Sequence, residues 1–171
     1  MTYFAVAAGG VRVNGTTTGF QDGESWIVTY RLFLDEAWCT RMAALTSTTA
    51  AGVAERVLES DGGGRWWVDG RAAPQLEGCL DVDLESSAMT NALPVRRLLL
   101  SVGGQAAAPA AYVRAFALGV ERLEQHYARR DDRDGSQQFD YDAPAFDFEC
   151  RLAYDQSGLV LQYPGIARRV A

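Results

Sequence analysis

The amino-acid sequence predicts a mainly β protein made of consecutive antiparallel strands, and two observations lead to that prediction. The first is a dense set of tight-turn signals, Asn14-Gly15 and four Asp-Gly pairs beginning at Asp22, Asp61, Asp69 and Asp134. Such dipeptides favour turns that need positive φ. The second is that apolar and polar residues alternate between the turns, which is the period of a strand with one buried face.

Length and composition limit the classes of protein. The chain has 171 residues, of which 48% are hydrophobic and 11% aromatic. We expect one globular domain over residues 1–171 that loses roughly two-thirds of its unfolded surface on folding. All 16 basic residues are arginine and the net charge is −6, so a broad basic surface for nucleic acid or anionic lipid is not expected.

The N-terminal segment and the cysteines indicate the cellular location. MTYFAVAAGGVRV has a short apolar run with no basic residue before it, and the run is too short to cross a bilayer. Cys39, Cys79 and Cys150 are odd in number and form no C-x-x-C pair, which favours reduced thiols over disulfides or zinc ligands. We therefore expect a strand at the N-terminus, no membrane span and a cytoplasmic protein.

Alternation predicts the strands in order. Residues 24–36, ESWIVTYRLFLDE, form a long strand whose apolar face consists of Trp26, Val28, Tyr30, Leu32 and Leu34. Residues 39–50 and 52–61 continue the pattern more weakly, and GRWWVDG, residues 64–70, is a brief strand between turns. Alternate residues from Phe146 to Tyr154 are apolar, and after a turn at 156–158 a last strand ends at Pro164.

The segment 111–129 supports two predictions. Tyr112, Phe116, Val120, Leu123 and Tyr127 recur at helical spacing after Pro109, so periodicity alone predicts a helix. Gly119 lies in the middle, however, and the segment divides equally well into two strands, 111–118 and 120–129.

CLDVDLE, residues 79–85, concentrates like charge in one strand. Leu80, Val82 and Leu84 point one way while Asp81, Asp83 and Glu85 share the other face. Three interpretations stay open: solvated carboxylates or carboxylates paired with Arg96 and Arg97 for structural reasons, a polar ligand site, and a hard-metal or hydrolytic carboxylate site.

Other catalytic and cofactor signals are weak. His126 is the only histidine and no G-x-S-x-G segment accompanies it, so a Ser-His-Asp triad is not expected. The glycine-rich segments DGGGR and VGGQ match neither nucleotide-binding pattern. We expect no cofactor and no bound metal.

Four segments carry a family resemblance. They are GRWWVDG, LEGCLDVDLESSAMTNALPVRRL, QHYARRD and DQSGLVLQYPG. Their order and approximate spacing resemble a bacterial family called the putative glycolipid-binding proteins, from about Tyr30 to Arg169. The most specific piece is L-x-G-C-x-D-x-D-L followed by T-N-x-L-P-[IV]-R-R-L, which ends at Leu98. The chain departs from the family pattern at Ala88, where a proline is usual, and at His126, where Q-R-Y is common.

The resemblance implies an antiparallel β-roll or open half-barrel with few short helices, in which a long curved sheet wraps a concave cavity. It favours two strands over a helix at 111–129. It also implies a lipid or glycolipid ligand, whose acyl chain the apolar concavity would hold while arginines and carboxylates at the rim bind the head.

These observations lead to a functional hypothesis, the binding of an amphipathic small molecule. The residues expected at its polar end are Arg31, Asp81, Asp83, Asn91, Arg96 and Arg97, and those expected in the wall are Tyr127 and Tyr163. One alternative is a metal-dependent hydrolase of a sugar or phosphate ester that uses Asp81 or Asp83. Another is a homo-oligomer, such as a homodimer, or a partner-binding module whose arginines pair across an interface.

Overall fold

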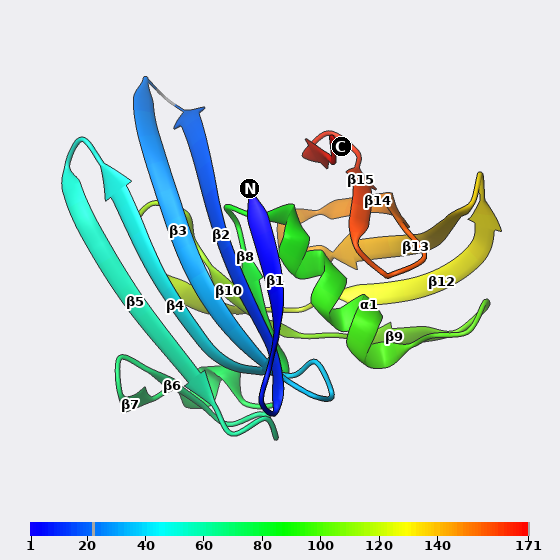
Figure 1. The fold of residues 1–171 in the computed structure, drawn as a ribbon, viewed down its shortest axis with the longest axis horizontal. Helices are drawn as coiled ribbons and strands as arrows, with labels where there is room; N and C mark the ends of the chain where they lie inside the picture. Colours follow the sequence, from blue (N-terminus) through cyan, green and yellow to red (C-terminus); the bar gives the residue numbers. More distant parts are fainter. Residues whose placement is uncertain (22, 171) are drawn as a thin grey trace.

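The structure, a computed structural model, describes residues 1–21 and 23–170 and consists mainly of strands (Figure 1). The strands are β1 (Thr2–Ala7), β2 (Gly10–Gln21), β3 (Glu24–Asp35), β4 (Thr40–Thr49), β5 (Gly52–Ser60), β6 (Trp66–Val68), β7 (Arg71–Ala72), β8 (Asp81–Leu84), β9 (Gln105–Ala107), β10 (Ala110–Val113), β11 (Val120–Leu123), β12 (His126–Arg133), β13 (Ser136–Ala143), β14 (Phe148–Tyr154), β15 (Val160–Tyr163) and β16 (Ala167–Arg168). One short helix, α1 (Ala92–Leu98), and three 3₁₀ turns, η1 (Pro74–Leu76), η2 (Ala88–Asn91) and η3 (Pro144–Phe146), complete the described elements. The prediction of a mainly β protein with few short helices is confirmed.

The first half of the chain forms a meander. Strands β1 to β7 pair in sequence order as one seven-stranded sheet, as the alternation predicts. The turns at Asp69-Gly70 and Asp134-Gly135 have positive φ at both residues, which is the geometry that these dipeptides favour in two-residue hairpins. The turn predicted at Asp22 lies partly outside the described residues, since only Gly23 of that pair is described.

The turn predicted at Asn14-Gly15 is wrong, because both residues lie inside β2. Gly15 is there for close packing: a Cβ added to it would lie 2.1 Å from Cζ of Tyr30 on the neighbouring strand. The buried Tyr30 ring therefore lies across the glycine, and its hydroxyl hydrogen-bonds Thr2 and Ser87, each at 2.9 Å. A glycine inside a strand often marks such a close approach.

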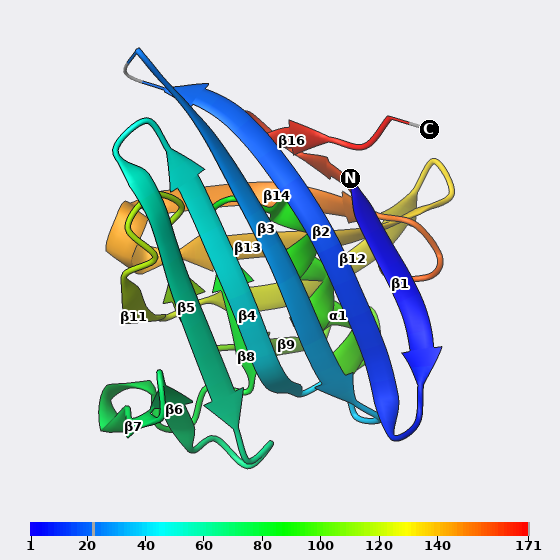
Figure 2. The same ribbon diagram turned by 60° about the vertical axis from the view of Figure 1, so that its left-hand side comes forward.

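The second half forms two further sheets. A six-stranded sheet has the order β16-β15-β14-β13-β12-β9, and a three-stranded sheet has the order β11-β10-β8, with β8 and β10 parallel. In Figure 2 the strands of the six-stranded sheet run behind the seven-stranded sheet and cross the direction of its strands, with α1 between the two sheets.

The core consists of two apolar clusters that meet near α1. One cluster joins the inner face of the seven-stranded sheet to β8 and β10, and Leu93 of α1 belongs to it. The other covers the inner face of the six-stranded sheet and includes Val95 of α1. The helix thus contributes to both clusters, and no described helix is long and apolar enough to cross a membrane.

The helix predicted at 111–129 is wrong, because the segment contributes to three strands instead. β10 and β11 form a hairpin around a turn at which Leu118 has φ of +52°, and β12 then crosses to the six-stranded sheet. The alternative of two strands in this segment is closer to the observed structure, although the first of them, β10, already ends at Val113. Pairing with β8 on one side and with β9 and β13 on the other outweighs the helical spacing.

Replacing Gly15 with alanine should destabilise the protein by about 1–3 kcal/mol, because the new methyl group would overlap a buried, hydrogen-bonded ring. Urea unfolding measures the change. The matched control is Gly119→Ala, where the nearest atom would lie 3.8 Å from the new Cβ and the effect should stay within about 0.5 kcal/mol. Equal losses in the two variants would contradict the packing role of Gly15.

Candidate ligand-binding cavity

A cavity of about 340 Å³ lies where β8, β10 and η2 meet the six-stranded sheet. Its lining residues come from segments far apart in the sequence: Asp83, Leu84, Glu85, Ala88, Asn91, Tyr112, Arg114, Leu123, Tyr141, Ala143, Phe146, Phe148, Tyr163 and Ile166. Sheet pairing brings them together, since β8 pairs with β10 and β13 pairs with β14. We call this space the aromatic cavity.

Aromatic rings form most of the cavity wall. Tyr141, Phe148 and Tyr163 contact one another, with ring centroids 5.9–6.4 Å apart. Tyr112 and Phe146 form a second pair at 5.4 Å. Burial raises the pKa of the Tyr141 and Tyr163 hydroxyls, so both keep their protons at neutral pH and can donate hydrogen bonds.

Asp83 supplies a buried carboxyl group to the cavity. Its Oδ1 accepts a hydrogen bond of 2.7 Å from the Thr90 hydroxyl and its Oδ2 accepts one of 2.5 Å from the Gln125 amide. Burial raises the pKa of Asp83, and the hydrogen bonds from Thr90 and Gln125 only partly offset this effect. The lining of the cavity thus includes a buried carboxyl group held by neutral donors.

Asn91 is fixed from two sides. Its side-chain amide donates to the Tyr127 hydroxyl at 2.9 Å, and its backbone carbonyl accepts from the Tyr154 hydroxyl at 3.1 Å. Tyr127 and Tyr154 are fully buried core residues of the six-stranded sheet. These bonds tie the start of α1 to that sheet and hold Asn91 at the cavity wall.

The mouth of the cavity differs from its inner wall. Phe146 and Ile166 are 42% and 58% exposed although both are large apolar residues. The Arg114 guanidinium lies 5.1 Å from the Tyr112 ring centroid and 5.5 Å from that of Phe146, within range of cation–π attraction. Arg114 also forms an ion pair with Glu85, whose carboxylate accepts the Ala115 N–H at 2.7 Å.

Asp81 and Arg97 form a buried ion pair apart from the cavity lining. Arg97 Nε and Nη2 donate to the two carboxylate oxygens of Asp81 at 3.1 and 2.5 Å. Burial lowers the pKa of Arg97, but the hydrogen bonds and charge of Asp81 outweigh it, so the pKa is raised and the guanidinium stays charged. This pair fixes α1 against β8.

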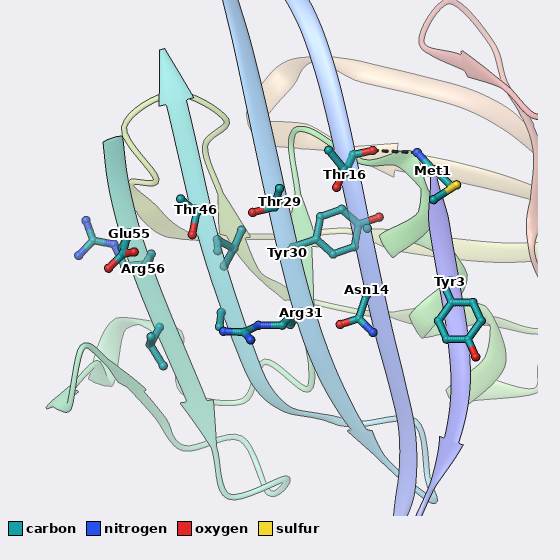
Figure 3. A pocket seen from close by; sticks show the side chains of 14 residues that line it. Met1, Tyr3, Asn14, Thr16, Thr29, Tyr30, Arg31, Thr46, Glu55 and Arg56 are labelled. Carbon is teal, nitrogen blue, oxygen red and sulfur yellow. Dashed lines mark hydrogen bonds between the residues drawn. The ribbon is translucent and has the colours of Figure 1, made fainter. Parts of the chain in front are cut away.

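The remaining predicted residues lie elsewhere. Arg96 is on another face, where its guanidinium stacks 3.9 Å from the Trp38 ring centroid and donates to the Ser157 carbonyl. Arg31 projects from the outer face of the seven-stranded sheet into a hollow of about 560 Å³ (Figure 3). Of the predicted set, Asp83, Asn91 and Tyr163 line the aromatic cavity, and Tyr127 supports it from the core.

The metal-dependent hydrolase stays a prediction. Both oxygens of Asp81 and both of Asp83 accept hydrogen bonds from protein donors. Across residues 1–21 and 23–170, no three His, Cys, Asp or Glu side chains group in a way that could hold a metal ion.

The cavity also uses residues that the sequence patterns did not single out as site residues, above all Tyr112, Arg114, Tyr141 and Ile166. Tyr141 and Phe148 occupy inward positions of two alternating strands, so alternation predicts burial but does not separate a cavity wall from a core. The parallel pairing of β8 with β10, which brings Tyr112 opposite Asp83, leaves no local signal.

Together the fold and the cavity define a mainly β protein in which an aromatic cavity with a buried carboxyl group opens beside the second of two large sheets. Residues 2–169 match the model of the family described as "Putative glycolipid-binding", and the chain belongs to this family. A crystal structure of a DUF1089 family protein from Pseudomonas aeruginosa is similar, with a TM-score of 0.84 and 31% identity over 99% of this chain and 91% of that chain. No curated protein sequence matches the chain.

Stability should respond to pH through Asp83. Since its pKa is raised in the folded chain, the unfolded chain loses its proton first as pH rises above the ordinary value of 3.8. The folded state therefore loses stability between that value and the raised one. Asp83→Asn removes this loss, so the stability of the variant relative to the parent should increase from pH 4 to pH 7 in urea unfolding. Parallel pH curves would contradict the assignment.

Arg97→Met should destabilise the protein by about 3–5 kcal/mol, because it leaves the Asp81 carboxylate buried without its partner. The control is Arg151→Met, which removes an exposed partner of Asp140 and should cost at most about 1 kcal/mol. Thermal and urea unfolding of the two variants compare the costs, and similar small values would show that Asp81 does not need Arg97.

Proposed function

We propose that the protein binds an amphipathic molecule, a glycolipid or related lipid, with its polar end inside the aromatic cavity and its apolar chain leaving through the mouth. One observation carries the proposal: the buried part of the lining contains hydrogen-bonding groups, those of Asp83, Asn91, Tyr141 and Tyr163, whereas the large apolar side chains of Phe146 and Ile166 are exposed at the mouth, beside the Arg114–Glu85 ion pair. An amphipathic ligand inserted head first would place its polar head against these hydrogen-bonding groups and its apolar chain against the side chains at the mouth.

The inner wall suits a sugar-like head. The Asp83 carboxyl accepts or shares a proton, the tyrosine hydroxyls donate and accept, and aromatic faces flank them, so ring hydroxyls can be hydrogen-bonded while the ring packs on an aromatic side chain. A volume of about 340 Å³ is at the lower end of ligand pockets, about 300–1,000 Å³. It accommodates a head group and not a whole lipid.

The mouth suits an apolar chain. Phe146 and Ile166 expose surface that water hydrates poorly, and an alkyl chain lying across them would bury it. Arg114 stands beside Phe146, and its charge is already balanced there by ion pairs with Glu85 and Glu121.

This orientation reverses the one expected from the sequence, in which the acyl chain fills a concavity and Asp and Arg form the rim. Asp83 is at the inner wall, and the arginine at the mouth is Arg114 rather than Arg96 or Arg97. The open half-barrel shape, the single domain and the cytoplasmic location stay predictions, and the proposal depends on none of them.

The test combines native mass spectrometry of protein purified from its own host with binding of octyl glucoside below its micelle concentration, followed by NMR. We expect a co-purified lipid, and octyl glucoside shifts at Tyr141 and Tyr163. Ile166→Asp should weaken octyl glucoside binding on the order of tenfold, as expected for losing a buried aliphatic contact. Val170→Asp, at another exposed apolar residue of the C-terminal segment that does not line the cavity, is the matched control.

Two results would contradict the proposal. One is an empty protein that also gives no octyl glucoside shifts in the aromatic cavity. The other is binding that Ile166→Asp and Val170→Asp weaken equally, because the mouth would then have no specific role.

A further inference from the structure

The outer face of the seven-stranded sheet is uncovered. No described element packs on it in either view of the ribbon (Figure 1, Figure 2). Large apolar or aromatic side chains on this face are nevertheless exposed, Tyr3 by 63%, Ile27 by 44%, Val53 by 65% and Val57 by 41%. An uncovered sheet face with several such residues is typical of an interaction surface.

Apart from ion-paired residues such as Arg56, which borders the hollow and pairs with Asp69, the charges of this outer face are sorted by strand. Arg12 on β2 and Arg31 on β3 are cations, and Glu55 and Glu59 on β5 are anions. Within residues 1–21 and 23–170, none of these four side chains has an ion pair or hydrogen bond. The strand between them, β4, presents uncharged side chains on the same face: Met42, Ala44, Thr46 and Thr48. Figure 3 shows Arg31 and Glu55 on either side of β4.

Strand register aligns the two sets of charges. Arg31 pairs with Ala44, and Ala44 pairs with Val57. Arg31 therefore lies level with Val57, which is midway between Glu55 and Glu59 on β5.

A second row across the sheet contains Arg12, Phe33, Met42, Glu59 and Trp67, each paired with the next. One end of this row is cationic. The other end offers a carboxylate and an indole ring.

We propose that two copies of the chain associate face to face through this sheet, related by a two-fold axis that runs along β4. Rotation about this axis places the partner's β5 over β3 and the partner's β6 over β2. Arg31 then lies between the partner's Glu55 and the partner's Glu59, and Arg12 meets the partner's Trp67. A two-fold axis perpendicular to the strands would instead place cations over cations, so the charge pattern selects the axis along β4.

The shape of the sheet agrees with this axis. A two-fold axis parallel to the strands leaves two right-handed twisted sheets stacked with their twists in the same sense, as in aligned sheet packing. The small side chains of Ala44 and Thr46 on the axis permit the spacing of about 10 Å between packed sheets.

The area reaches the range of specific interfaces. The strands β2 to β6 overlap in this arrangement, with β6 contributing three residues, and at about 4.8 Å between strands and 3.3 Å per residue they cover roughly 500 Å² per copy. The two copies together then bury about 1,000 Å², the lower bound for a specific interface. The association goes beyond the proposed ligand function and does not involve the aromatic cavity.

Sedimentation equilibrium over micromolar to near-millimolar concentrations tests the association. We expect a dimer of twice the chain mass of 18.6 kDa. Arg31→Glu should raise the dissociation constant on the order of tenfold or more, because it places three carboxylates together. Glu55→Arg should also weaken the dimer, and the double variant Arg31→Glu/Glu55→Arg should recover most of the affinity.

The control is Arg168→Glu, at an exposed arginine of the six-stranded sheet that should leave the dimer unchanged. Circular dichroism confirms that each variant is folded. A monomer at every concentration would overturn the proposal, as would a dimer indifferent to Arg31→Glu or a double variant that is no tighter than the single ones.

Discussion

Burying the carboxyl groups of β8 is costly in free energy, and the arrangement of the second half of the molecule follows from how that cost is offset. An ionised carboxylate without a partner cannot remain in an apolar interior. Asp81 meets Arg97 from α1, and Asp83 meets Thr90 from η2 and Gln125 from the segment before β12. Three separate elements must therefore reach β8 in defined positions. Their apolar residues then join the two core clusters on either side of the helix.

The same requirement shapes the aromatic cavity. Asn91 can reach the Tyr127 hydroxyl only when η2 and α1 are held against β8, and this bond leads directly into the core of the six-stranded sheet. The cavity therefore lies beside a hydrogen-bonded network and not in a flexible loop. Its polar groups are already fixed in position, which would reduce the entropy lost on binding the proposed ligand.

Sequence patterns predict the parts of this structure that depend on local periodicity and turn chemistry. The long strand 24–36 has its apolar side inside, with Val28, Tyr30, Leu32 and Leu34 buried as alternation indicates. Sequence patterns also single out Asp81, Asp83 and Arg97. They cannot show that β8 is buried on both faces, because that depends on its parallel pairing with β10, 29 residues further along the chain. The segment 111–129 fails for the same reason, since distant strands outweigh its helical spacing.

Asp83 illustrates why a protein would keep a destabilising group. An apolar residue in its place would remove the burial cost that raises its pKa, and Thr90 and Gln125 would then lose their acceptor. A core that served stability alone would favour such a replacement together with its neighbours. Under the proposed function the inner wall must hydrogen-bond a polar head, and an apolar replacement of Asp83 would remove that capacity. Local departures from optimal stability concentrate where a site is needed, and the carboxyl group of Asp83 is such a departure at the wall of the aromatic cavity.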